Sequence, residues 1–300
     1  MTEQLTLFCR DNGIFFQTRV PMKNLTTFKI GGACDILAQP ESEDQIAKLI
    51  RFCAQEKFPV FIIGKGSNLL VSDEGVRGLV ILLSNRFSDL SVNGAQITCQ
   101  AGCSLSKLCK FAARNGLSGL EFAYGIPGTA GGAVYMNAGA YGREMKNVVF
   151  STKHINAAGQ TEIRLSKDLN FQYRKSWYTD ESCCITSITF DLTPDEPALI
   201  EQRMNEFMAK RLEKQPLELP SAGSTFKRPE GAFAGALIER CGLKGYSVGG
   251  ASVSEKHAGF VVNQSNATCR DTDELIKTIQ QTVFEKTGYR LDCEVKRIGP

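Results

Sequence analysis

The segment GIPGTAGGAVYMNAGAYG, residues 125–142, is the stretch that most narrows the choice of fold. It holds six glycines in eighteen positions together with Pro127, a composition that favours neither a regular helix nor a strand. Apolar residues between the glycines, such as Ala133 and Val134, are expected to be half buried, which a plain surface loop does not explain. We therefore predict that this backbone lies against a flat or charged ligand.

A second glycine-rich turn, Gly64-Lys65-Gly66-Ser67-Asn68, follows the apolar run 60–63. Glycines at such a turn let backbone N–H groups approach a phosphate closely. The turn is not a dinucleotide fingerprint, because Leu69 stands where that motif needs glycine, and it is not a P-loop. A tight strand connection is the alternative. Two such turns in one chain favour an extended cofactor with a pyrophosphate.

The flanking segments predict a β-α-β opening. Residues 42–57 place Ile46, Leu49 and Cys53 on one helical face, and Ser42 stands at the start of this helix with Gln45 at capping-box spacing. Strands are expected on both sides of the second turn, so the sequence predicts an α/β fold. Further strands are expected near 97–101, 148–156, 184–192 and 291–298, and further helices near 104–116, 197–214, 232–240 and 271–286.

Composition excludes several classes of protein. The 300 residues are enough for two or three domains. A net charge of +3 gives no reason to expect nucleic acid as a partner, and no apolar run reaches the roughly 20 residues of a membrane span. The N-terminus does not read as a secretory signal, and the 11 scattered cysteines favour reduced thiols in a cytoplasmic protein. With only two histidines, we expect no metal site.

Several segments in order along the chain are similar to one known family, that of the UDP-N-acetylenolpyruvoylglucosamine reductases. The similarity covers nearly the whole chain from Asn24 onward. The segments are FKIGGACDIL (28–37), FIIGKGSNLLVSDEGVRGLVI (61–81), YGIPGTAGGAVYMNAGAYG (124–142), FQYRKSWY (171–178), SAGSTFKRP (221–229), HAGFVVN (257–263) and LDCEVKRIG (291–299).

The resemblance implies an α/β (α+β) chain with the FAD-binding fold of the vanillyl-alcohol-oxidase type. It implies two subdomains around FAD, residues 1–82 and 83–212, and a UDP-sugar-binding domain at 213–300 whose terminal strand returns to the FAD domain. The implied reaction is the NADPH-dependent reduction of UDP-N-acetylglucosamine enolpyruvate to UDP-N-acetylmuramate through FAD. This is a step of peptidoglycan synthesis and so of cell wall biogenesis, cell shape, cell cycle and cell division. The protein is expected to be a cytoplasmic monomer.

The chain resembles the shorter of the family's two types. That type lacks an inserted capping loop that bears a tyrosine, and the stretch between Arg174 and Ser221 leaves no room for one. Which residues close over the UDP moiety therefore stays open.

Three residues fall on the family's catalytic positions. Arg174 would grip the substrate carboxylate, since a guanidinium is planar and permanently charged, and the aromatic residues around it could hold it in place. Ser224 would supply a proton, and Glu294 would either donate a hydrogen bond or order the serine and nearby water. By residue type alone, a surface arginine, a turn serine and an exposed glutamate are the simpler readings.

The resemblance also implies which residues bind the ligands. Tyr141, Tyr173, Lys227, Arg228 and His257 would contact the substrate, although His257 could equally be a buried histidine whose hydrogen bonds are satisfied. The expected FAD contacts are Gly64, Lys65, Gly66, Ser67, Asn68, Leu69, Gly125, Ile126, Pro127, Gly128, Thr129, Gly131, Gly132, Ala133 and Val134.

Two other functions are compatible with parts of this sequence. The first is another flavin oxidoreductase of the same fold, but many of those attach FAD through a histidine, and neither His154 nor His257 lies in the first glycine-rich segment. The second is a nucleotide-sugar binding protein without catalysis, and the presence of all three catalytic residue types counts against it. An RNA-binding role is disfavoured by the balanced charge.

Overall fold

The computed structural model describes residues 2–300, and the chain divides into two compact units. Each has its own apolar core. The core of unit 2 joins Phe28, Ile30 and Leu70 to residues from the last third of the chain. Unit 1 comprises the chain up to Thr18, Asp35–Lys65 and Gly78–Arg211, and unit 2 comprises Arg19–Cys34, Gly66–Arg77 and Leu212–Pro300.

The predicted β-α-β opening is confirmed. Helix α2 (Glu43–Gln55) follows the strand Ala33–Gln39 and precedes the strand Val60–Ile63. The strand Val60–Ile63 pairs in parallel with the strand Val76–Leu82, with Val60 opposite Leu79. Ser42 Oγ accepts from Gln45 N at 3.2 Å, but Gln45 Oε1 accepts from Glu41 N, so the capping box is not reciprocal. The sheet order is β1 (Phe15–Pro21), β2 (Ala33–Gln39), β5 (Val76–Leu82), β3 (Val60–Ile63).

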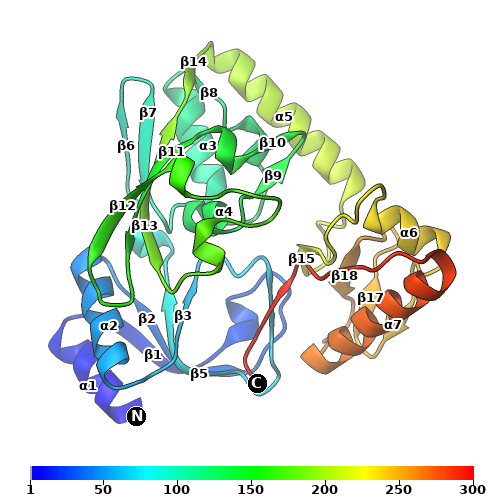
Figure 1. Cartoon of the computed structure of the whole chain (residues 1–300), viewed down its shortest axis with the longest axis horizontal. Helices are drawn as coiled ribbons and strands as arrows, with labels where there is room; N and C mark the ends of the chain where they lie inside the picture. Colours follow the sequence, from blue (N-terminus) through cyan, green and yellow to red (C-terminus); the bar gives the residue numbers. More distant parts are fainter. Residues whose placement is uncertain (1) are drawn as a thin grey trace. The chain divides into compact units, whose positions relative to one another are not determined.

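A second, antiparallel sheet of five strands belongs to unit 1 (Figure 1). Three of its strands fall where the sequence predicts them, near 97–101, 148–156 and 184–192. Its order is β12 (Thr161–Leu165), β11 (Val149–Ile155), β13 (Cys184–Asp191), β7 (Gln96–Gln100), β6 (Leu90–Asn93). Two-stranded ladders join β9 (Gly139–Ala140) to β10 (Arg143–Glu144) and β8 (Leu117–Ser118) to β14 (Thr193–Pro194).

The prediction that residues 125–142 form no regular structure is wrong in part. Residues Ala130–Tyr135 form the short helix α4, because Thr129 caps its first turn and its apolar side is buried against the core.

The other helices of unit 1 are α1 (Thr2–Asp11), α3 (Leu105–Arg114) and α5 (Pro197–Lys214), of which α5 runs past the end of the unit. Single 3₁₀ turns are η1 (Met22–Asn24), η2 (Asn85–Phe87), η3 (Glu121–Ala123), η4 (Met145–Asn147), η5 (Ser166–Asp168) and η6 (Trp177–Thr179).

Unit 2 is built on a four-stranded antiparallel sheet. Its longest helix, α7 (Cys269–Thr287), begins at a Thr268 capping box and ends at Gly288, whose φ of 76° gives the left-handed turn expected of a C-terminal glycine. The sheet order is β15 (Ser221–Ser224), β18 (Phe260–Asn263), β17 (Ala251–Val253), β16 (Ser247–Val248), and the other helix is α6 (Ala234–Arg240).

The terminal strand is shorter than predicted. Only β19 (Lys296–Ile298) is regular, and it pairs in parallel with β4 (Leu69–Val71). Glu294 N donates to Thr225 O, whereas Lys296 N donates to Asn68 O, so the chain changes partners between these residues. Cys293, in the irregular stretch before β19, is exposed.

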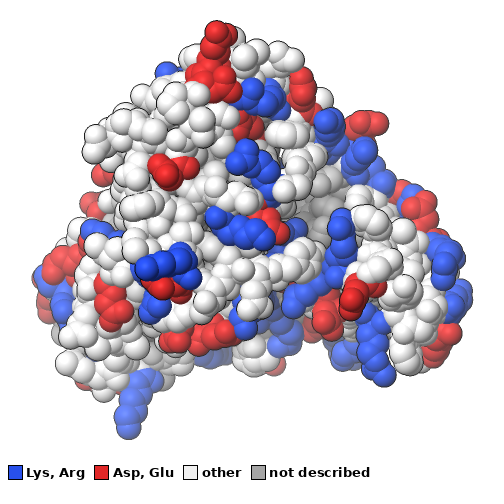
Figure 2. Space-filling model, turned by 45° about the horizontal axis from the view of Figure 1, so that its top comes forward, with Lys and Arg blue, Asp and Glu red and all other residues white. Residues whose placement is uncertain are grey.

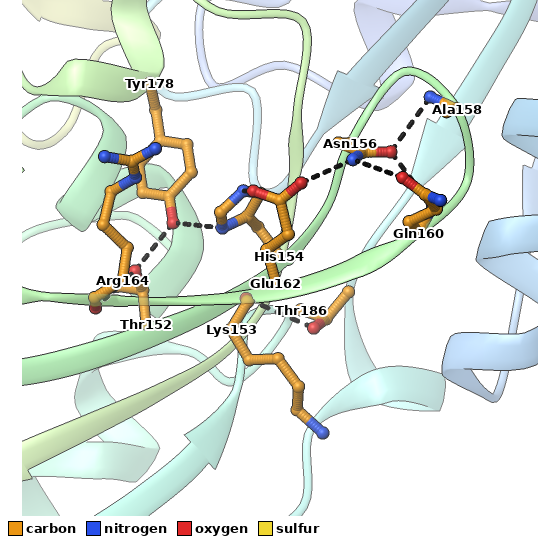
Figure 3. A network of polar contacts seen from close by, with 10 residues as sticks. All are labelled: Thr152, Lys153, His154, Asn156, Ala158, Gln160, Glu162, Arg164, Tyr178 and Thr186. Carbon is orange, nitrogen blue, oxygen red and sulfur yellow. Dashed lines mark hydrogen bonds and ion pairs between the residues drawn. The ribbon is translucent and has the colours of Figure 1, made fainter.

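A buried polar network crosses the second sheet (Figure 3). His154 in β11 is fully buried, and its Nδ1 lies 3.0 Å from the Tyr178 hydroxyl, which lies 2.7 Å from Thr152 Oγ1. Across the strand pair, Glu162 Oε2 lies 3.5 Å from His154 Nε2. Burial lowers the pKa of His154 below its usual value, so the neutral ring is favoured in the folded chain.

Basic and acidic side chains are interspersed on the face shown in Figure 2. Between residues 2 and 300 no helix is both long and apolar enough to span a membrane.

Replacing Thr268 with Ala should lower the free energy of unfolding by about 1 kcal/mol, because the first turn of α7 loses the acceptor of the Asp271 N–H. The matched control is Thr278→Ala, which removes a mid-helix hydroxyl that bonds Glu274 O and should cost less than about 0.5 kcal/mol. Urea unfolding of both variants checks this. If both variants lost the same free energy of unfolding, the Thr268 cap would contribute no more than a mid-helix hydroxyl.

The free energy of unfolding should fall as the pH drops below the ordinary pKa of histidine. The folded-state pKa of His154 is depressed, so its contribution is present above the unfolded pKa of about 6.5 and is lost as the unfolded chain gains a proton. His154→Gln should make this fall shallower, as measured by urea titrations from about pH 7.5 to 5.5. The same slope in the variant and the wild type would contradict the assignment.

Candidate functional site

The residues that the sequence predicts for the site are divided between the two units, which we describe in turn. Unit 1 holds Gly64, Lys65, the segment from Gly125 to Val134, Tyr141, Tyr173 and Arg174. Unit 2 holds the segment from Gly66 to Leu69, Ser224, Lys227, Arg228, His257 and Glu294.

In unit 1 the end of β3 packs closely on the start of α4. A Cβ atom on Gly64 would lie 2.2 Å from Thr129 Oγ1, so any other residue at this position would push the turn and the helix apart. Thr129 Oγ1 accepts from Gly132 N at 3.4 Å. Gly132 is exposed, and a Cβ there would meet only Thr129 Oγ1, at 3.5 Å. The two predicted glycine-rich segments therefore pack together at Gly64 and Thr129, and Gly132 leaves a bare backbone surface that a side chain would cover.

The turn after β3 offers unused backbone donors. Among the hydrogen bonds found over residues 2–300, none is donated by the N–H of Lys65, Gly66 or Ser67. Consecutive N–H groups without an internal acceptor are the feature that lets a turn bind phosphate oxygens. These N–H groups are therefore able to bind the oxygens of a phosphate group.

Arg174 lies at the tip of a tight turn in unit 1. Gln172 and Lys175 exchange backbone hydrogen bonds of 2.9 and 3.2 Å, so Tyr173 and Arg174 are the two residues of the turn. Arg174 has a φ of 56°, an uncommon value for a residue with a side chain, and its Cζ lies 5.0 Å from the centre of the Tyr173 ring. The turn thus presents an arginine and a tyrosine from adjacent positions, and a guanidinium is suited to a bidentate grip on a carboxylate.

The other aromatic residues near Arg174 have different partners. The guanidinium over the Trp177 ring, at 3.5 Å, is that of Arg164, and Tyr178 belongs to the buried network of His154. Tyr141 has a φ of 53°, stacks on Phe207 with ring centres 4.4 Å apart, and donates its hydroxyl proton to Phe207 O at 2.9 Å. The residue as a whole is 40% exposed.

In unit 2 the segment after β15 runs antiparallel to the segment around Glu294. Glu294 N donates to Thr225 O at 2.8 Å, and Lys227 N donates to Asp292 O at 2.8 Å. Ser224 and Glu294 are both half buried and are only one backbone hydrogen bond apart along this ladder. The backbone of unit 2 therefore bonds Glu294 to Thr225, the residue that follows Ser224.

Asn68 fixes the same segment from the other side. Its Nδ2 donates to Glu294 O at 3.2 Å, and its carbonyl accepts from Lys296 N at 2.9 Å. The sequence suggests Asn68 only as a cofactor contact and does not show its hydrogen bond to the Glu294 backbone. No sequence signal could have shown it, because the two residues are 226 positions apart.

His257 is held in one tautomer by its own loop. Its Nδ1 accepts from Gly259 N at 3.1 Å, so in the neutral ring Nε2 carries the proton. His257 is half buried, and burial lowers its pKa.

Two cations are also among the predicted substrate contacts of unit 2. Lys227 is half buried, and the Arg228 guanidinium lies 4.1 Å from the centre of the Phe233 ring. Unit 2 thus holds one neutral donor and two cations among the predicted substrate contacts.

Two family models match the chain. Residues 34–163 match a family described as an FAD binding domain, and residues 215–298 match the C-terminal domain of UDP-N-acetylenolpyruvoylglucosamine reductase.

Curated relatives agree over the whole length. The UDP-N-acetylenolpyruvoylglucosamine reductase of Caldanaerobacter subterraneus subsp. tengcongensis is 48% identical over 93% of this chain and 92% of its own. That of Streptococcus pneumoniae strain JJA is 42% identical over 96% and 95%. The crystal structure of the Thermus caldophilus reductase superposes with a TM-score of 0.83 at 35% identity, over 95% of this chain and 100% of its own.

These matches confirm the expected fold class, the α/β (α+β) architecture with the FAD-binding fold of the vanillyl-alcohol-oxidase type. With relatives more than 40% identical over almost the entire length, the chain belongs to the UDP-N-acetylenolpyruvoylglucosamine reductase family.

Proposed function

We propose that this chain reduces UDP-N-acetylglucosamine enolpyruvate to UDP-N-acetylmuramate with NADPH and FAD, in peptidoglycan synthesis, and that Arg174, Ser224 and Glu294 carry the chemistry. Membership of the reductase family supports the reaction. The observation that supports the residue assignment is the ladder of unit 2, in which Glu294 N bonds the carbonyl of Thr225, the residue that follows Ser224.

The residues that would hold FAD are those of the two glycine-rich segments. The free N–H groups after Gly64 would bind the pyrophosphate, and the bare surface at Gly132 would let the cofactor approach the backbone. When bound, FAD supplies the redox group that passes a hydride from NADPH to the enolpyruvyl double bond.

Arg174 would bind the substrate carboxylate. Adding hydride to the enolpyruvyl group develops negative charge on the carbon next to that carboxylate, so a fixed cation there stabilises the transition state more than the ground state. The tight turn that presents Arg174 beside Tyr173 provides a fixed position of this kind.

Ser224 would give the proton from its Oγ to the same carbon, from the face opposite the incoming hydride. A serine hydroxyl is a very weak acid and needs polar support. Glu294, whose N–H bonds the carbonyl of Thr225 next to Ser224, would supply it, and Lys227 on the same segment would add positive charge.

Further residues would bind the UDP-sugar. Lys227 and Arg228 would pair with the diphosphate, and the His257 Nε2–H would donate to an oxygen of the ligand. Tyr141 and Tyr173 would offer exposed aromatic faces. We also propose that residues 1–82 and 83–212 act as the FAD subdomains and 213–300 as the UDP-sugar domain, in a cytoplasmic monomer.

The purified protein should be yellow, lose its visible flavin band when NADPH is added without oxygen, and regain it when the enolpyruvyl UDP-sugar follows. Bleaching without recovery would leave a flavin oxidoreductase with another acceptor. A colourless protein that cannot be reconstituted with FAD would favour a binding protein without catalysis.

Ser224→Ala should slow the recovery of the flavin band by about 10²- to 10⁴-fold, the usual effect of removing a positioned proton donor. Bleaching by NADPH should change by less than about twofold, since that step needs no such proton. Ser247→Ala, which removes an exposed hydroxyl bonded to Gly245 O, is the control. Stopped-flow absorbance measures both steps. Recovery at the wild-type rate would remove Ser224 from the mechanism.

A further inference from the structure

The strand that carries Ser224 is irregular. Between Ser221 and Ser224 the β15–β18 register shifts, because Ser221 pairs with Val262 and Ser224 with Phe260. One extra residue is thus accommodated on β15, and Gly223 takes a φ of 76° there. The bulge changes the direction of the chain immediately before Ser224.

A side chain completes the hydrogen bonds of this ladder. Asn263 N, on β18, donates to Pro220 O at 2.8 Å, and Gly259 O, just before β18, accepts from Thr225 N at 2.9 Å. Between these two, Val261 N donates to Thr225 Oγ1 at 2.9 Å. The threonine hydroxyl therefore serves as the acceptor of a β18 amide beside the bulge, where a regular strand would offer a backbone carbonyl.

The backbone of Thr225 reaches the second catalytic candidate. Its carbonyl accepts from Glu294 N at 2.8 Å, and its side chain is almost completely buried, with 1% exposure. Thr225 thus follows Ser224 in the chain and is bonded to Glu294, and its own position depends on the Val261 hydrogen bond.

We propose that Thr225 is a positioning residue for the reduction, and that its hydroxyl sets the placement of Ser224 and Glu294 through the bulge. This inference rests on the proposed function. Thr225 itself does not touch the substrate in this scheme. Its hydroxyl fixes the two groups that do.

Position 225 requires a hydroxyl as hydrogen-bond acceptor, and the shape of the threonine side chain alone is not enough. Valine has nearly the same shape, but it would leave the buried Val261 N–H without an acceptor. The strand would then shift to satisfy that N–H, and Ser224 would move with it. Serine keeps the acceptor and should keep the geometry.

The test compares both half-reactions in Thr225→Val, Thr225→Ser and wild type, each loaded with FAD. In Thr225→Val, recovery of the flavin band with the enolpyruvyl UDP-sugar should slow by about ten- to a hundredfold, as expected for misplaced reacting groups. Bleaching by NADPH should change by less than about twofold, and Thr225→Ser should recover at nearly the wild-type rate.

Thr272→Val is the matched control. Thr272 is also a fully buried threonine of unit 2, and its hydroxyl bonds to Thr268 O in α7. The stability of Thr272→Val should be measured by urea unfolding alongside that of Thr225→Val, and both half-reactions should be unchanged. This comparison separates placement of the reacting groups from a general loss of stability.

Several results would overturn the proposal: wild-type recovery in Thr225→Val, equal slowing of both half-reactions, or the same recovery defect in Thr272→Val. If Thr225→Val does not fold, the same two half-reactions are measured in Gly223→Ala. A Cβ atom at Gly223 meets nothing within 4 Å, so this substitution acts only by straining the backbone of the bulge. Selective slowing of its recovery supports the proposal, and wild-type recovery refutes it. A wild-type protein that is bleached but never recovers would instead refute the proposed function on which this inference rests.

Discussion

The hydrogen bond from Glu294 N to Thr225 O is the interaction on which the organisation of unit 2 depends. It joins the last residues of the chain to the strand that follows the bulge. Leu291 and Val295, on either side of Glu294, are buried in the core of the unit together with Phe226. Apolar burial therefore brings the two segments together, and the backbone bond sets their register. Ser224 and Glu294 are placed by this register, although neither contributes a side chain to the core.

Much of the fold could be predicted because local signals agree with long-range packing. The opening β-α-β arrangement follows from helical periodicity and a short apolar run, and α7 follows from its cap and from Gly288. Helix α4 was missed, because its glycines lower helix propensity while its stability comes from the Thr129 cap and burial. The terminal strand was drawn too long, because alternation of residues does not reveal where a chain changes partners.

The site was predictable to the extent that it follows family positions. Arg174, Ser224 and Glu294 could be named from resemblance, and their residue types alone would have suggested ordinary surface groups. The supporting residues could not be named. A threonine directly after a strand is an ordinary residue in the sequence, so the role of the Thr225 hydroxyl shows only when β18 is seen beside the bulge. Asn68 was assigned to the cofactor for a similar reason, since its bond to the Glu294 backbone joins distant parts of the sequence.

Trp177 is the only tryptophan of the chain, and it belongs to unit 1, where the guanidinium of Arg164 lies 3.5 Å from its ring centre. Intrinsic tryptophan fluorescence therefore reports on unit 1 alone, and unit 2 is silent to this probe. Circular dichroism, in contrast, receives signal from the helices of both units. If the two units unfold together, the denaturation curves from the two methods coincide, and if they unfold independently, the curves differ. Comparing the two curves therefore measures the cooperativity between the units without an added label.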